Sequence, residues 1–267
     1  MSSGAYAIER RLYLSPHLDD AVLSCGGQIA RAARATATVD ILTIFAGDEP
    51  DPANPSASPL VDQVFALWGL PAGEVMSTRR REDAAACRLL QARCEQWKLQ
   101  EAIHRRDPAT GEALYTSLKA LFGDVSPQEE PLIAGLARRL ADLAPDDSTR
   151  VFAPLGIGGH VDHRIVRQAA ERAFGSRLCY YEEFPYIVWK LFARRRAGVS
   201  KRQFEALRQA LSAEDVAARI AAIACYASQV PSLFSTRKNL ARQVHKHVRR
   251  ARGERVWRRR RPDGPVS

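Results

Sequence analysis

The chain places one imidazole and two carboxylates within four residues, directly after a short apolar run. His17, Asp19 and Asp20 belong to the stretch Ser-Pro-His-Leu-Asp-Asp at 15–20, and the apolar run occupies 12–14. Such a run predicts a buried strand, so the polar cluster would lie where that strand ends. Open α/β sheets build their binding sites at the carboxyl ends of parallel strands. The first cluster is therefore a candidate site.

A second cluster at 158–163 (Gly-Gly-His-Val-Asp-His) follows another apolar run at 150–155. It contributes two imidazoles, His160 and His163, and the carboxylate of Asp162. Zinc favours nitrogen and carboxylate oxygen donors, and a catalytic zinc site typically has three protein ligands and one position for water. Two histidine–aspartate clusters at strand exits therefore predict a hydrolytic metal site.

The spacing assigns some of these roles and leaves others open. His17 and Asp20 can both face one ion across a strand-to-helix turn, which would leave Asp19 free to act on water. Either His160 or His163 could supply the third ligand. Taken one at a time, these residues have simpler interpretations, because an Asp before a helix is commonly an N-cap and a lone His is commonly structural. The joint pattern favours the metal site.

The elements that must position the two clusters alternate between strands and helices. Strands are expected at 11–15, 38–45, 96–99, 150–155 and 178–182, and helices at 21–35, 80–92, 127–143 and 161–174. The rest, including 213–228, is expected to be mainly helical. A strand, a helix and a second strand form a βαβ unit, which implies a parallel sheet with a right-handed crossover.

The segment at 47–59 is crowded with Pro, Asp, Ser and Asn, and it is too broken for regular structure. It would leave the carboxyl end of a strand beside the proposed site. It is therefore a candidate lid, with an ordinary surface linker as the equal alternative.

Composition narrows the class of protein. The 267 residues are 46% hydrophobic, which suits one α/β domain with insertions or a terminal extension. No apolar run approaches the ~20 residues that cross a bilayer, and the first residues lack a signal-peptide core, so we expect a cytoplasmic protein. Five scattered cysteines without a CxxC pair indicate reduced thiols, not disulfides or a thiolate metal site.

The net charge of +10 is concentrated at 194–196 and at 242–261. Attraction to phosphates, in nucleic acid or in an anionic substrate, is one interpretation. A solvated basic tail is the other, and it is favoured because the chain has no repeat and no recognisable nucleic-acid module. We expect no specific nucleic-acid partner.

Both clusters, with their flanks, resemble the LmbE-like, PIG-L superfamily of zinc-dependent de-N-acetylases. The specific motifs are SPHLDDAVLSCGG, which begins at Ser15, and GGHVDH at 158–163. Supporting similarities lie at 81–84, 181–186, 222–229 and 254–257, so the resemblance covers most of the chain. It implies a Rossmann-like, three-layer α/β fold with a mostly parallel central sheet and helices on both faces.

The resemblance also implies the roles of the first cluster and of one histidine from the second. Zinc would be held by His17, Asp20 and His163. Asp19 would be the general base that takes a proton from water and then delivers it to the leaving amine.

The remaining roles implied by the resemblance concern the reacting carbonyl and the substrate. A protonated His160 would stabilise the oxyanion, and Asp162 would orient His160 or a metal ligand. Some relatives carry a tyrosine at the position of Gly158. Arg81 and Glu101 are the candidate substrate-binding residues, although an arginine near a helix start is commonly structural.

We therefore expect one LmbE-like deacetylase domain over 1–245 and a basic C-terminal extension over 246–267, partly packed through Trp257. The expected function is a zinc-dependent hydrolase that removes acetyl from an N-acetylated amino sugar or its conjugate. Its partner would be that small-molecule glycoconjugate, with a homo-oligomer possible. The alternatives are hydrolysis of another amide and an anion-binding protein with a vestigial metal site.

Overall fold

The computed structural model describes residues 10–49, 59–71, 73–144, 148–189, 197, 200 and 202–260. Within them, seven strands form one sheet in the order β3-β2-β1-β4-β5-β7-β6. The first five strands in this order, β3, β2, β1, β4 and β5, run parallel, and β7 is antiparallel to both of its neighbours. The expected α/β fold with a mostly parallel sheet is confirmed. The strands are β1 (Arg10–Ser15), β2 (Thr38–Thr43), β3 (Arg93–Gln96), β4 (Thr149–Pro154), β5 (Cys179–Tyr181), β6 (Phe204–Gln209) and β7 (Glu254–Arg259).

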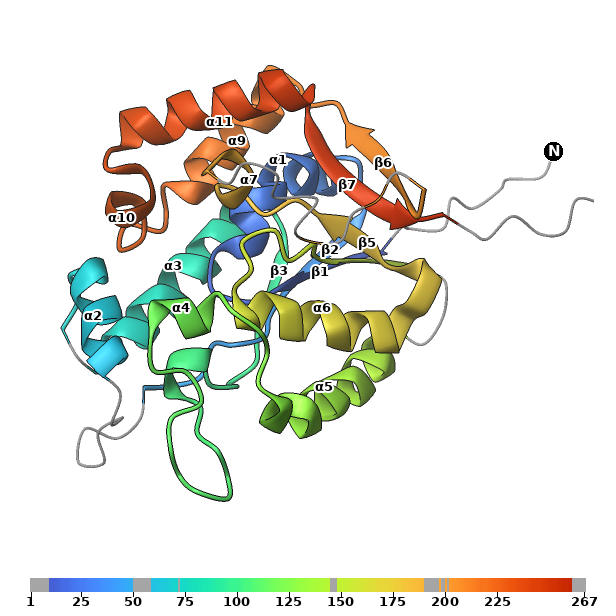
Figure 1. Cartoon of the computed structure of the whole chain (residues 1–267). Coiled ribbons are helices and arrows are strands. Elements are labelled where there is room, and N and C mark those ends of the chain that lie inside the picture. Colours follow the sequence, from blue (N-terminus) through green and yellow to red (C-terminus); the bar gives the residue numbers. More distant parts are fainter. Residues whose placement is uncertain are drawn as a thin grey trace, which may run out of the picture.

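Helices cover both faces of this sheet (Figure 1). Helices α1, α9 and α11 lie together on one face, and α5 and α6 pack side by side on the other. The helices are α1 (Asp20–Arg34), α2 (Pro59–Trp68), α3 (Val75–Leu89), α4 (Leu118–Leu121), α5 (Glu130–Leu143), α6 (Val161–Phe174), α7 (Tyr186–Trp189), α9 (Ala213–Ile223), α10 (Val230–Phe234) and α11 (Arg237–Ala251). None of these described helices is long and apolar enough to span a membrane.

The central strand β1 shows why the sheet is buried on both faces. Tyr13 packs into the cluster with α1 and α9, whereas its neighbours Leu12 and Leu14 pack into the cluster with α5 and α6. Successive side chains of a strand point to opposite faces, so a continuous apolar run requires a cover on each side. The three-layer prediction is confirmed by these two clusters.

The C-terminal third differs from the expected mainly helical structure, because it contributes two strands. Strand β6 is at the edge of the sheet, and after the buried Phe204 its side chains alternate between half-buried and exposed; β7 lies between β5 and β6. The expected boundary at 245 falls inside α11, and Trp257 belongs to β7. Residues 254–259 are thus part of the sheet and not of an extension. A short strand with charged residues on one face gives a weak local signal, and only its pairing partners reveal it.

Smaller differences concern boundaries. Strand β3 lies three residues earlier than expected, at Arg93–Gln96, and α3 begins at Val75. Most of the candidate lid at 47–59 lies outside the described residues. All five cysteines are free, as the sequence predicted.

Candidate metal centre and catalytic residues

The two sequence clusters meet at the carboxyl edge of the sheet. Strands β1 and β4 are adjacent and parallel, so the turns that follow them lie side by side. Asp20 Oδ2 lies 3.3 Å from His17 Nδ1 and 3.2 Å from His163 Nε2. One donor atom from each of these three residues lies within 4.8 Å of the others. His160 lies in a second such group, with His17 and Asp162, so the choice of His163 as the third ligand stays a prediction.

The hydrogen bonds of His163 show that its free nitrogen suits a metal ion. Its Nδ1 lies 3.3 Å from Glu183 Oε1, and its buried Nε2 has no hydrogen-bond partner. A proton on Nδ1 satisfies the carboxylate and leaves the Nε2 lone pair directed at Asp20. A carboxylate behind the ligating imidazole is the usual support of a metal-bound histidine.

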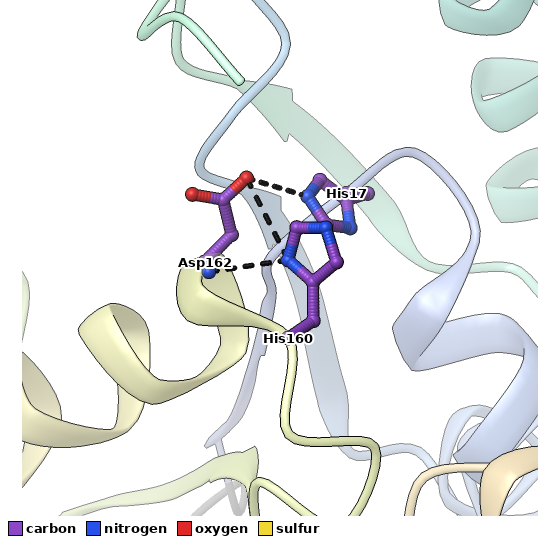
Figure 2. Close-up of side chains that lie close together, drawn as sticks. All are labelled: His17, His160 and Asp162. Atoms are coloured by element: carbon purple, nitrogen blue, oxygen red, sulfur yellow. Dashed lines mark hydrogen bonds and ion pairs between the residues drawn. The ribbon is translucent and has the colours of Figure 1, made fainter. Parts of the chain in front are cut away.

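His17 has the same arrangement with the opposite nitrogen. Its Nε2 lies 2.9 Å from Asp162 Oδ2, which leaves Nδ1 facing Asp20. Figure 2 shows Asp162 at the start of α6 with one oxygen directed at this ring. Two imidazole lone pairs and one carboxylate form the donor set of a divalent transition-metal site, so the residues present fit the ion.

Protons compete with a metal ion for these nitrogens. Burial lowers the pKa of His163, but the Asp20 carboxylate and hydrogen bonds outweigh burial and raise the pKa to about 9. Burial also lowers the pKa of His17, but the hydrogen bonds to Asp162 and Asp20 outweigh burial and raise this pKa. Metal binding therefore requires loss of protons from both rings.

Asp19 has the surroundings of a general base and not of a helix cap. It occupies the N-cap position of α1, but its side chain makes no capping hydrogen bond. Its φ of 149° is in a region that residues other than glycine rarely adopt, and such strain is typical of functional sites. Burial and the neighbouring Asp20 raise the pKa of Asp19 to about 8. This carboxyl group can exchange a proton near neutral pH.

His160 differs from the expected protonated form. Burial and the neighbouring His17 lower the pKa of His160 to about 3, so the ring is neutral at physiological pH. The Asp162 backbone N–H donates to His160 Nδ1 at 3.2 Å. The ring proton is thereby placed on Nε2, where it can be donated in a hydrogen bond. A neutral N–H donor replaces the cation that the sequence suggested.

Asp162 fits both possibilities left by the sequence, because its carboxylate lies 2.9 Å from His17 Nε2 and its backbone N–H donates to His160 Nδ1. It is fully buried and lies 2.7 Å from the Arg105 guanidinium. Although burial raises the pKa of Asp162, Arg105 and His17 hold it below its ordinary range. Arg105 could not be found from the sequence, because an arginine in a motif-free segment carries no local signal of an ion pair with a residue 57 positions away.

Of the two predicted substrate-binding residues, Glu101 lies near the cluster, because its charge helps to raise the pKa of His17 and the next residue, Ala102, donates its backbone N–H to Asp162 Oδ2. Arg81 is exposed and contacts Thr78. Glu101 is buried and pairs with Arg79 at 2.7 Å. Arg79, and not Arg81, lies near enough to Asp19 to lower its pKa. The roles of Arg81 and Glu101 in substrate binding stay predictions.

Gly158 leaves space for a tyrosine from elsewhere in the chain. A Cβ built at Gly158 would lie 3.0 Å from the ring of Tyr186, and that ring is centred 5.9 Å from the His163 ring. Tyr186 thus packs where a side chain at 158 would stand. Burial raises the pKa of Tyr186, so its phenol stays protonated. The sequence showed that position 158 lacks a tyrosine, but it did not show that the ring of Tyr186 lies beside this position.

Two histidines and one aspartate at the carboxyl edge of a three-layer α/β sheet are residue types that hold divalent metal ions in hydrolases. The chain belongs to the PIG-L family, described as GlcNAc-PI de-N-acetylase, which matches residues 12–174. The resemblance found in the sequence motifs is confirmed.

Two curated relatives are 2'-N-acetylparomamine deacetylases. The Streptomyces fradiae protein is 30% identical over 186 residues, covering 66% of this chain and 57% of the relative. The Niallia circulans protein is 28% identical over 190 residues, covering 66% of each chain. These alignments thus span less than two thirds of the relatives' length. A solved structure of a zinc-inhibited form of teicoplanin deacetylase Orf2 has a TM-score of 0.80 at 29% identity, covering 95% of this chain and 99% of that one.

Proposed function

We propose that this chain is a zinc-dependent deacetylase that hydrolyses the acetamide of an N-acetylated amino sugar carried on a larger molecule. The observation that carries the proposal is the convergence of His17, Asp20 and His163, with the carboxyl group of Asp19 next to Asp20 and not used as a helix cap. The deacetylases among the relatives and solved structures support the choice of reaction. Two nitrogen donors and one carboxylate support the choice of zinc.

Each ligand is held in place by a second residue. Asp162 accepts from His17 and Glu183 accepts from His163, so both rings present a fixed lone pair to the ion. Asp20 also accepts from the His17 backbone N–H at 2.9 Å, which locks the turn after β1. A bound zinc ion would act as a Lewis acid toward water and the amide carbonyl.

Asp19 and His160 would handle the proton and the developing charge. With a pKa near neutral pH, Asp19 can accept a proton from the attacking water and return it to the amine as the C–N bond breaks. The Nε2–H of His160 can donate to the carbonyl oxygen as negative charge builds there. A neutral donor of this kind can stabilise the oxyanion without a change of its own charge.

The decisive experiment separates ligands from proton-handling residues. Asp20→Ala and His163→Ala should reduce metal content measured by elemental analysis, because each removes one of three protein donors. Asp19→Asn and His160→Ala should retain the metal and lose turnover of N-acetylglucosamine conjugates, measured as acetate and free amine. Full metal retention by Asp20→Ala, or metal loss by Asp19→Asn, would contradict the assignment.

The same measurements test the two alternatives. If the chain hydrolyses a different amide, a panel of amides with other acyl groups would release amine in a metal-dependent reaction, and N-acetyl sugars would release none. An anion-binding protein would show a salt-sensitive gel shift without hydrolysis. Two arginines of the basic segment are already paired within the chain, because Arg258 and Arg259 of β7 lie against Glu205 and Glu171.

A further inference from the structure

Exposed apolar side chains are concentrated on two short helices. Among the described residues, five large hydrophobic side chains are exposed. Four of them lie on α7, on α4 or directly after α4, with exposed fractions of 50% for Leu118, 39% for Phe122, 40% for Val188 and 48% for Trp189. Scattered exposed apolar residues are ordinary, whereas a grouped set marks a binding surface.

Ring contacts join this set to the candidate catalytic residues. The Phe122 ring is centred 5.2 Å from His160 and 6.5 Å from Tyr186. Tyr186 in turn lies 5.9 Å from Trp189 and 5.9 Å from His163. We call Leu118, Phe122, Tyr186, Val188 and Trp189 the apolar rim. Phe122 and Tyr186 thus connect His160 and His163 to the exposed ring of Trp189.

Building on the proposed function, we propose that the apolar rim binds an apolar aryl or alkyl group attached to the N-acetyl sugar. A sugar presents mainly hydroxyl groups, which do not require exposed Trp, Phe, Val and Leu side chains beside them. An aryl or alkyl group in the same substrate would cover these side chains while the acetamide reaches His160. Aromatic rings 5–7 Å apart offer the edge-to-face and offset contacts that such groups favour.

A substrate series tests the proposal. The methyl, butyl, hexyl and phenyl β-glycosides of N-acetylglucosamine share one acetamide and differ only in the apolar group. Burial of one methylene is worth up to about fourfold in affinity. We expect kcat/KM of the wild-type chain to rise at least 10-fold from the methyl to the hexyl glycoside, and the phenyl glycoside to exceed the methyl one.

Rim variants show where the preference arises. Trp189→Ala and Leu118→Ala should each lower the hexyl-to-methyl ratio of kcat/KM by roughly 3-fold or more. Leu89→Ala is the matched control, because Leu89 is the fifth exposed side chain, at 43%, and lies on α3 outside the rim. This variant should keep the wild-type ratio. Circular dichroism spectra of all variants would exclude unfolding as the cause.

The possible outcomes separate the two proposals. Equal kcat/KM across the glycosides, with acetate released from each, would overturn the apolar-group proposal and leave the deacetylase proposal standing. A second outcome is no acetate release from any glycoside, combined with tight binding of the hexyl glycoside in a Trp189-dependent fluorescence titration. This outcome would overturn the deacetylase proposal and leave the apolar-group proposal standing. A dimer that Trp189→Ala dissociates, with an unchanged glycoside ratio, would assign the rim to a second copy of this chain and overturn the proposal.

Discussion

Replacing Asp19 with Asn should weaken catalysis and stabilise the metal-free protein at the same time. Asn has nearly the same shape and tolerates the unusual backbone angle of residue 19 better than most residues do. It cannot accept the water proton, so turnover should fall roughly 10²–10⁴-fold. It also removes a buried carboxylate that burial and Asp20 penalise when it is charged.

The pH dependence of the stabilisation follows from the pKa of Asp19, which is about 8 in the folded chain against an ordinary value of 3.8. Below about pH 4 the carboxyl group is protonated in both states, so the variant gains nothing. Between pH 4 and 8 the folded wild type retains a proton that the unfolded chain has lost, and its stability falls as pH rises. Above pH 8 the full cost is present, and the variant gains most.

The difference of about 4 units between the folded and the ordinary pKa of Asp19 corresponds to at most about 6 kcal/mol in the free energy of unfolding. Local relaxation reduces this value, so we expect a gain of at least ~2 kcal/mol at pH 9, or about 4–8 °C in Tm for a chain of this size. The assay is thermal unfolding in chelator at pH 4, 6, 7.5 and 9, with acetate release measured on the metal-loaded protein. Asp142→Asn, on the exposed side of α5, is the control and should change neither quantity.

An Asp19→Asn variant no more stable than the wild type at pH 9 would refute the account of its surroundings. A variant with full turnover would refute its role as the base. The two results are independent, because the first depends on burial and the second on proton transfer.

Three further changes test the supporting structure. Glu183→Gln should weaken metal affinity roughly 10–100-fold in equilibrium dialysis, because the charged acceptor behind His163 is lost; unchanged affinity would contradict that support. Gly158→Ala should lower kcat about 10-fold or more, because its Cβ would displace the Tyr186 ring, and a wild-type rate would show that the ring position is unimportant. Deletion of 258–267 should cost about 1–3 kcal/mol in denaturant unfolding, because it shortens β7, whereas deletion of 261–267 leaves β7 whole and should cost nothing measurable.

The sequence by itself predicted the βαβ order, the parallel sheet and the convergence of two polar clusters. These features depend on local patterns, namely apolar runs of strand length, helical periodicity and polar residues at strand exits. Parallel neighbours must present their carboxyl ends at the same edge, so His17 and His163 could be expected to meet before the fold was known.

Only the tertiary structure decided which residues support the site. Arg105 reaches the second cluster from a segment without a motif. Glu183 and Tyr186 belong to the segment at 181–186, whose resemblance to the family did not reveal their contacts with His163 and Gly158. The role of β7 is also a long-range outcome, because an antiparallel strand can join a parallel sheet only where a neighbour's edge is open. The charge states of side chains also depend on the tertiary structure, because burial and the neighbouring charged groups set the pKa of Asp19 and of His160. Local pattern fixes the elements and their order, whereas packing between distant segments fixes the chemistry of the side chains they carry.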